Sequence, residues 1–283
     1  MFNVIVSGSD GFIAKHLISK LSKRKKVKII KMGKNFGDIS NKNTWRKLPA
    51  ANTLIHLAGQ TFVPKSWSKP GEFFQSNVLG TIMALEYCRT HNVKLIFISS
   101  YLYGNANKFP TNEKAKIKIN NPLALTKMTA EKICKFYSKY YGLKIIILRP
   151  SNIYGPSQKD FWLIPEILNK FKKKTIIVNN FNIKRDLIYV ADLVEAIIKS
   201  IYLKNNFEII NIGSGKSYSI RSIVHVIQKI YHTKVSVKNR NIVRRKEILQ
   251  TKLDIKKAKK ILKWKPIWSL EEGLRYTIKK VSN

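Results

Sequence analysis

The chain has 283 residues, 44% of them hydrophobic, and carries 54 Lys and Arg against 16 Asp and Glu, a formal net charge of +38. That length suits one domain with a smaller lobe, and the absence of any run of 18 apolar residues excludes a membrane span. The start, MFNVIVSGSDGFI, lacks the basic and apolar regions of a signal peptide, and both Cys fall in helical patterns, which predicts a cytoplasmic protein with reduced thiols.

The charge has two interpretations. It could form a basic surface for nucleic acid or an anionic membrane. Alternatively it reflects composition, because 44 Lys stand against 10 Arg beside abundant Ile and Asn, as in proteins from AT-rich genomes. The Lys residues are scattered along the whole chain, which favours the second interpretation. We therefore expect neither nucleic acid nor a membrane as a partner.

Strand and helix patterns alternate along the chain, which predicts an α/β fold with a doubly wound parallel sheet (Rossmann-like) and a smaller C-terminal lobe. Strands are expected at residues 2–7, 27–32, 53–57, 94–99 and 144–149, and helices at 12–23, 77–91 and 123–141. Pro and Gly mark loops beyond residue 149. Later strands at 176–178 and 208–212 predict that the chain revisits the sheet.

A glycine-rich turn, SGSDGFIA, joins the first strand to the first helix. Its glycines permit a tight turn and a close approach of a pyrophosphate to the backbone at the N-terminus of the helix. Because the pattern stands between a strand and a helix, it predicts a dinucleotide site. We assign to this site Gly8, Asp10, Gly11, Phe12 and Ile13.

The end of the second strand bears on the choice of dinucleotide. Proteins that bind NAD often place Asp or Glu there to hold the ribose 2′-hydroxyl, but this chain has Met32. Lys31 or Lys34 could instead pair with a 2′-phosphate, so we predict NADP or NAD, with NADP slightly favoured. Asp38, followed by Ile39, suits a contact with the adenine amino group, although a turn cap explains Asp38 nearly as well.

Further motifs extend the pattern along the chain: HLAGQ at 56–60, SNVLGT at 76–81, FISSYLYG at 97–104, RPSNIYGP at 149–156, KRDLIYVADL at 184–193 and NIGSG at 211–215. With these motifs the chain resembles the extended short-chain dehydrogenase/reductase family of NAD(P)-dependent nucleotide-sugar epimerases, dehydratases and reductases. The resemblance implies a dinucleotide-binding domain at 1–155 and a substrate-binding lobe mainly at 156–283, with segments near 176–215 returning to the main sheet.

The resemblance also implies individual contacts. Leu57, Ala58 and Gly59 fall on the cofactor side. Asn152, Arg185 and Arg244 fall where the family binds the diphosphate of a nucleotide sugar, and Arg suits that role because it forms bidentate bonds with phosphate. The resemblance implies a homodimer through the helices at 77–91 and 123–141, and apolar Leu85, Ile133 and Phe136 exceed one sheet-facing stripe. No metal is expected.

The reaction centre departs from the family at one position. The family reaction moves a hydride between nicotinamide and a sugar carbon, together with a proton at the sugar hydroxyl. Ser99 falls at the catalytic Ser or Thr, and Lys127 at the Lys that holds the cofactor ribose. Leu123 falls at the catalytic Tyr, and a Leu side chain has no proton to give.

Three hypotheses follow from Leu123. Tyr101 could carry the proton, since it lies three residues before Gly104, where dehydratases of the family have a catalytic Glu; packing is its other interpretation. Water or a substrate hydroxyl could carry the proton in a slow enzyme. The chain could also bind a nucleotide sugar without converting it. We favour an NAD(P)-dependent nucleotide-sugar epimerase or ketoreductase of surface-polysaccharide biosynthesis, with a weak or inactive binding protein as the alternative.

Overall fold

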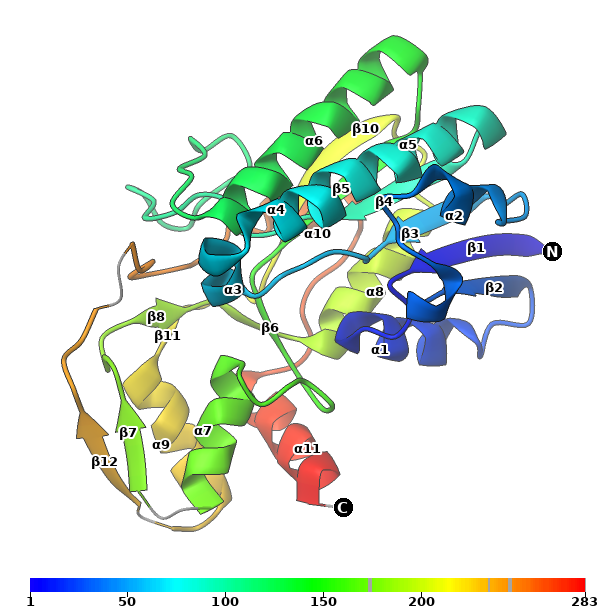
Figure 1. The fold of residues 1–283 in the computed structure, drawn as a ribbon. Helices are drawn as coiled ribbons and strands as arrows, with labels where there is room; N and C mark the ends of the chain where they lie inside the picture. Colours follow the sequence, from blue (N-terminus) through cyan, green and yellow to red (C-terminus); the bar gives the residue numbers. More distant parts are fainter. Residues whose placement is uncertain (173–174, 234, 244–245, 283) are drawn as a thin grey trace.

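A six-stranded parallel sheet forms the centre of the molecule (Figure 1). The computed structural model describes residues 1–172, 175–233, 235–243 and 246–282. The strand order is β10–β5–β4–β3–β1–β2, and each neighbouring pair is parallel. These strands are β1 (Phe2–Ser7), β2 (Val27–Met32), β3 (Thr53–His56), β4 (Lys94–Ile98), β5 (Ile145–Pro150) and β10 (Phe207–Ile212). The predicted α/β fold with a parallel sheet is confirmed.

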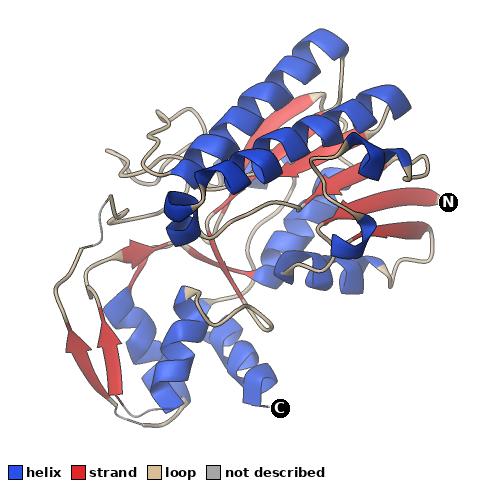
Figure 2. Ribbon diagram, in the orientation of Figure 1, coloured by secondary structure: helices blue, strands red, loops and turns tan. Residues whose placement is uncertain are grey.

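Helices cover both faces of this sheet (Figure 2). On one face lie α1 (Phe12–Leu21) and α8 (Val190–Ile201), and on the other lie α5 (Gly80–His91) and α6 (Pro122–Tyr141). Alternate residues of a strand point to opposite faces, so in β1 Val4 joins the first core and Ile5 the second. A sheet buried on both faces requires continuous apolar strands, which is why the sequence reveals them.

Short helices follow β2 and β3 in the chain. They are η1 (Lys34–Phe36), α2 (Lys42–Arg46), α3 (Val63–Ser68), α4 (Pro70–Phe74) and the π-helical turn η2 (Gln75–Leu79), which runs directly into α5. Among the described residues, no helix has the length and apolar character needed to cross a membrane.

Three small two-stranded sheets and three helices form the lobe below the main sheet in Figure 1. The sheets pair β6 (Asn152–Tyr154) with β9 (Leu187–Tyr189), β8 (Lys184–Arg185) with β11 (Tyr218–Ser219), and β7 (Thr175–Val178) with β12 (Ser236–Asn239). The helices are α7 (Leu163–Lys172), α9 (Ile220–Ile230) and α11 (Leu270–Ser282), while α10 (Lys256–Ile261) packs near β10.

One of the two late strands returns to the main sheet and the other does not. β10 pairs with β5 and extends the sheet at its edge, as the sequence predicts for 208–212. The prediction for 176–178 is wrong, because within the described residues β7 pairs with β12 alone, in a separate sheet of the lobe. An apolar run identifies a strand but carries no information about its partner.

The order of strands reverses at β1, which has β2 on one side and β3 on the other. In open α/β sheets, ligands bind beyond the carboxyl ends of the strands at such a switch point. The loops that follow β1, β3 and β4 therefore delimit the candidate site.

Candidate active site

The loop after β1 forms a cradle, a concave stretch of backbone in which Gly8 and Gly11 leave room for a ligand. Gly8 has φ +70°, and a Cβ at this position would lie 2.8 Å from the backbone nitrogen and Cα of Ala58. The backbone nitrogen of Gly11 donates to the carbonyl of Gly8 at 2.9 Å, and Gly11 caps α1 without any side-chain bond. Among the described residues no side chain caps the first N–H groups of α1, which lie at the carboxyl edge of the sheet and suit an anionic group.

A carboxylate lies beside the end of β2, although β2 itself supplies none. The Oδ2 atom of Asp10 accepts a hydrogen bond from the backbone nitrogen of Lys34 at 2.7 Å. The backbone nitrogens of Gly8 and Ser9 donate to the Met32 carbonyl at 2.8 Å and 3.3 Å, which ties the two loops together. The Lys34 side chain is exposed.

Asp38 and Ile39 lie next to this corner. The Oδ1 atom of Asp38 accepts from both the backbone nitrogen and the hydroxyl of Ser40 at 2.9 Å, so this carboxylate acts as a turn cap. Its Oδ2 accepts from Gln75 at 3.2 Å. The carbonyl of Ile39 accepts from the indole of Trp45 at 2.7 Å, which fixes the segment against α2.

Lys127 is a buried ammonium in the middle of the site. It lies on α6 with 5% of its surface exposed, and its Nζ donates to the Ile98 carbonyl at 2.9 Å. The Nζ also lies 4.9 Å from the centroid of the Phe97 ring. Burial lowers the pKa of this ammonium to about 8. A Cβ on Gly59 would be 3.8 Å from the Nζ, so Gly59 opens the space in front of the charge.

Ser99 follows β4 directly and is the second polar group of the centre. Its Oγ is buried and has no hydrogen-bond partner among the described residues. Buried hydroxyls in folded proteins nearly always have a partner in protein or ordered water, so this hydroxyl can donate to a ligand. Leu123 lies in the first turn of α6, one turn before Lys127, and is 7% exposed. The position to which the sequence assigns the family's catalytic phenol therefore carries an apolar, nearly buried side chain.

Tyr101 points its hydroxyl back to its own loop. The hydroxyl donates to the carbonyl of Gly104 at 3.1 Å, and the ring makes an edge contact with Tyr103 at 5.3 Å between centroids. Burial raises the pKa of the Tyr101 hydroxyl to about 12. In this arrangement Tyr101 packs against Tyr103 and donates a hydrogen bond to the backbone of its own loop.

The predicted substrate contacts come from the lobe. Arg185 donates to the Ile248 carbonyl at 2.6 Å and pairs with Glu247 at 2.7 Å. Asn152 is exposed at the start of β6. Arg244 lies outside the described residues. The described part of the chain therefore contains one basic side chain of the predicted set, and that side chain is held by a carboxylate.

Two buried polar groups escaped the assignment from sequence. Asn77, in η2, accepts from the backbone nitrogen of Gln60 at 2.8 Å and donates to Thr126 at 3.0 Å, so it anchors the Gly59 loop to α6. The guanidinium of Arg149 donates to Glu131 from β5 to α6, with Nε to Oε1 at 2.9 Å. The only sequence signal for either was its place in a family motif.

Comparison with known proteins places the chain in a family. Residues 4–213 match the model of the NAD dependent epimerase/dehydratase family. The chain belongs to that family. A UDP-glucuronate 4-epimerase of Thermodesulfobacterium geofontis is 32% identical over 80% of the chain and 71% of the relative. A GDP-6-deoxy-D-mannose reductase of Pseudomonas aeruginosa is 25% identical over 96% and 94%.

Solved structures of two nucleotide-sugar epimerases and of a third protein share the whole architecture. A UDP-N-acetylglucosamine 4-epimerase from Methanobrevibacter ruminantium, in complex with UDP-N-acetylmuramic acid, has a TM-score of 0.92 at 27% identity, covering 99% of this chain and 98% of that chain. A mutant UDP-glucuronic acid 4-epimerase from Bacillus cereus, in complex with UDP-4-deoxy-4-fluoro-glucuronic acid and NAD, has a TM-score of 0.92 at 25% identity, covering 99% of each chain. A Pseudomonas aeruginosa protein complexed with NADPH has a TM-score of 0.90 at 24% identity, covering 99% of this chain and 98% of that chain.

The residues present fit the dinucleotide on which this NAD(P)-dependent family relies. A side chain at Gly8 would fill the cradle beside Ala58, so the cradle is open only because Gly stands there. The free N–H groups of α1 suit a pyrophosphate, and Lys127 suits ribose hydroxyls as a donor. The described residues contain no group of three potential metal ligands.

Proposed function

We propose that the protein is an NAD(P)-dependent nucleotide-sugar epimerase or ketoreductase. The observation that carries this proposal is the pair formed by Ser99 and Lys127 at the end of β4. The Ser99 hydroxyl is buried and has no hydrogen-bond partner among the described residues. The Lys127 ammonium is buried and donates to the carbonyl of Ile98, the residue before Ser99. Without a ligand, the unpaired hydroxyl and the buried charge each lower the stability of the folded protein. The hydroxyl suits a bound sugar oxygen, and the ammonium suits a bound ribose.

In this proposal each side chain has a defined task. The bound dinucleotide supplies the hydride acceptor or donor. Ser99 donates its hydrogen bond to the reacting sugar oxygen, where negative charge develops. Lys127 donates to the ribose hydroxyls and contributes positive charge near that oxygen. Asn77 and Gly59 act through position, because they hold the loop that leaves room for the cofactor.

Tyr101 is the proposed proton carrier, since position 123 has no phenol; in this role its hydroxyl must turn from the Gly104 carbonyl towards the substrate. With a pKa of about 12, its phenol is protonated at neutral pH but is a weaker acid than free Tyr, so it can give its proton only to a strongly basic oxygen, such as the alkoxide that forms when a keto sugar is reduced. This direction favours a ketoreductase, in which the product oxygen gains a proton. Tyr101→Phe is expected to lower kcat by about 10²-fold or more, while nucleotide-sugar affinity stays unchanged. Full activity of that variant would leave water or a substrate hydroxyl as the carrier.

The alternative function is binding without turnover, and Leu123 is the observation that favours it. Leu123→Tyr restores the phenol of the family one turn before Lys127. A rate increase in this variant, with wild type inactive towards UDP-glucose, UDP-glucuronic acid and GDP-sugars, would support the alternative. Measurable redox change of the bound nicotinamide in wild type, followed at 340 nm with those sugars, would contradict it.

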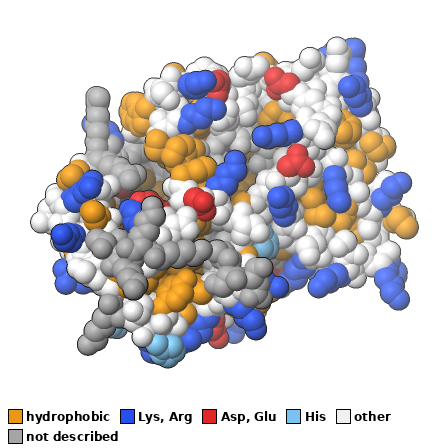
Figure 3. Space-filling view, turned by 60° about the horizontal axis from the view of Figure 1, so that its bottom comes forward, with side chains coloured by type: hydrophobic (Ala, Val, Ile, Leu, Met, Phe, Trp, Pro, Cys, Tyr) orange, Lys and Arg blue, Asp and Glu red, His pale blue; other side chains and the backbone are white. Residues whose placement is uncertain are grey.

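We further propose a nucleotide-diphosphate sugar as the substrate, bound by Asn152, Arg185 and Arg244, in the cytoplasm and in the synthesis of surface-polysaccharide sugars. The relatives named above act on or hold UDP- and GDP-sugars. On the face seen in Figure 3, Lys and Arg side chains are interspersed with neutral and hydrophobic ones rather than gathered into one stripe. That pattern gives no support to a nucleic-acid partner on this face.

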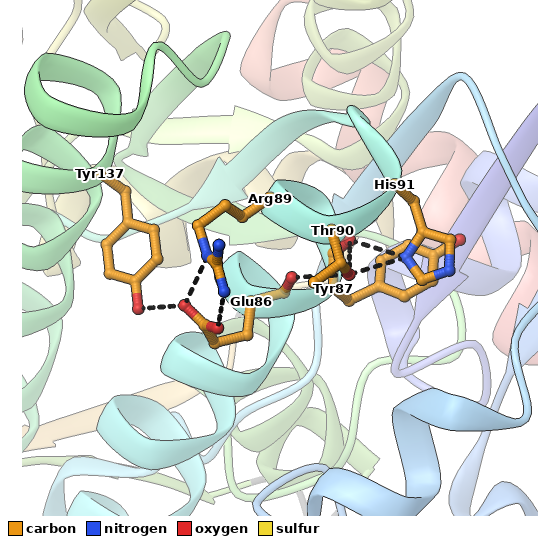
Figure 4. A network of polar contacts seen from close by, with 6 residues as sticks. All are labelled: Glu86, Tyr87, Arg89, Thr90, His91 and Tyr137. Atoms are coloured by element: carbon orange, nitrogen blue, oxygen red, sulfur yellow. Dashed lines mark hydrogen bonds and ion pairs between the residues drawn. The ribbon is translucent and has the colours of Figure 1, made fainter.

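A homodimer through α5 and α6 is also proposed. Tyr137 of α6 donates to Glu86 of α5 at 2.6 Å, and Arg89 donates to the same carboxylate, which fixes the two helices together (Figure 4). Outside this network, Phe136 and Tyr140 of α6 are 50% and 61% exposed. Adjacent exposed aromatics are characteristic of interaction surfaces.

A further inference from the structure

The carboxylate that β2 lacks is supplied by the loop after β1. β2 ends at Met32 and continues with Gly33 and Lys34, none of which is acidic. Asp10, between the two glycines of the cradle, reaches across to this end and accepts from the backbone nitrogen of Lys34 at 2.7 Å through Oδ2. Within the described residues its Oδ1 makes no hydrogen bond or ion pair, so one carboxylate oxygen is available to a ligand.

Gly33 makes this position of Asp10 possible. A Cβ on Gly33 would lie 2.5 Å from Oδ2 and 2.6 Å from Oδ1 of Asp10, well inside van der Waals contact. Any other residue at 33 would displace the carboxylate. The glycine and the aspartate are therefore two halves of one arrangement, separated by 23 positions in the sequence.

The location of this carboxylate has a chemical consequence. At the end of β2 a carboxylate accepts hydrogen bonds from the adenosine ribose hydroxyls of NAD, whereas a 2′-phosphate there would meet a like charge. Among the described residues the Lys34 side chain forms no ion pair with Asp10, so that ammonium does not hold the carboxylate. We propose that Asp10 takes over the role of the missing β2 carboxylate and selects NAD over NADP.

This inference rests on the proposed dinucleotide site and opposes the preference for NADP that Lys34 suggests from the sequence. The alternative is a purely structural role, in which Asp10 only fixes the turn at Lys34. Asp10→Asn separates the two roles, because the amide oxygen still accepts from the Lys34 nitrogen while the charge is lost.

The test is calorimetric titration of the whole chain with NAD⁺ and NADP⁺, without sugar or turnover. Wild type is expected to bind NAD⁺ more tightly by about tenfold, or about 1.4 kcal/mol. Asp10→Asn should reduce the ratio of the two dissociation constants by about tenfold, with an unchanged midpoint of thermal unfolding. Gly33→Ala should reduce the ratio in the same direction, since it displaces the carboxylate.

The outcomes separate the inference from the function beneath it. Binding of both dinucleotides with a ratio that Asp10→Asn leaves unchanged would overturn the role of Asp10 and leave the proposed function standing. Tighter binding of NADP⁺ by wild type would also overturn it. Binding of neither dinucleotide would overturn the proposed function itself. Lys34→Ala is the matched control, because the backbone nitrogen that Asp10 uses is retained, and its ratio should still favour NAD⁺.

Discussion

Replacing Lys127 with Met should stabilise the ligand-free protein at neutral pH. The ammonium is 5% exposed, and burial lowers its pKa from 10.5 to about 8. One pKa unit corresponds to about 1.4 kcal/mol, so holding the charge in this site costs roughly 3 kcal/mol. Replacing Lys127 with Met removes this cost. It also removes the hydrogen bond to Ile98 and the contact with Phe97, which offsets the stabilisation by about 1–2 kcal/mol. The expected net stabilisation at pH 7 is therefore about 1–2 kcal/mol.

The pH dependence of this difference identifies its cause. Below pH 8 the Lys127 side chain is protonated in both the folded and the unfolded chain, so wild type bears the full cost. Between pH 8 and 10.5 the folded state releases its proton first and the unfolded state still holds one, so the stability of wild type rises relative to Lys127→Met. Wild type regains roughly 3 kcal/mol across this range, which exceeds the net advantage of the variant, so the difference should fall to zero and then change sign.

Urea unfolding of both proteins at pH 7, 8.5 and 10 measures the effect. Lys94, whose pKa burial also lowers to about 8, is present in both proteins, so its contribution cancels in the difference. A free-energy difference between the two proteins that stays constant from pH 7 to 10 would refute the reasoning, because it would show that the charge of Lys127 carries no cost in the folded chain.

Three further results are expected. Gly8→Ala should weaken dinucleotide binding at least tenfold with unchanged circular dichroism, because the new Cβ meets Ala58 at 2.8 Å; equal affinity by fluorescence titration would contradict the cradle. Arg149→Met should cost about 3–5 kcal/mol in urea unfolding, since Glu131 is left buried and unpaired, and a loss below 1 kcal/mol would speak against that pair. Phe136→Glu should halve the mass found by light scattering for wild type, and a monomeric wild type would end the dimer proposal.

The sequence predicts the sheet well because the energetics of its strands are local to each strand. A strand buried on both faces must be apolar throughout, and β4 and β5 each consist almost wholly of apolar residues. The choice of partner is not local. β7 is as apolar as these strands, yet it pairs with β12 more than fifty residues later, in the separate sheet of the lobe.

The candidate site shows the same limit. The glycine turn predicts its own conformation, because a positive φ at Gly8 depends on that residue and its neighbours. The carboxylate at the end of β2 could not be found from the residues of β2, since Asp10 arrives from another loop. Likewise, the ion pair between Arg185 and Glu247 joins residues 62 positions apart. Contacts across the sheet edge require the fold.

The sequence assigns Leu123 to the position of the family's catalytic Tyr, and the rest of the site weighs against a purely structural role. An unpaired buried hydroxyl at Ser99 costs about 1–3 kcal/mol, and the buried charge of Lys127 roughly 3 kcal/mol more. Stabilising substitutions are readily available to natural proteins, so a scaffold needed only for its shape has no reason to keep both costs. Local violations of good packing are expected where function demands them. The retention of Ser99 and Lys127 beside an apolar Leu123 therefore argues for a ligand that engages both, and for a reaction in which the proton comes from elsewhere.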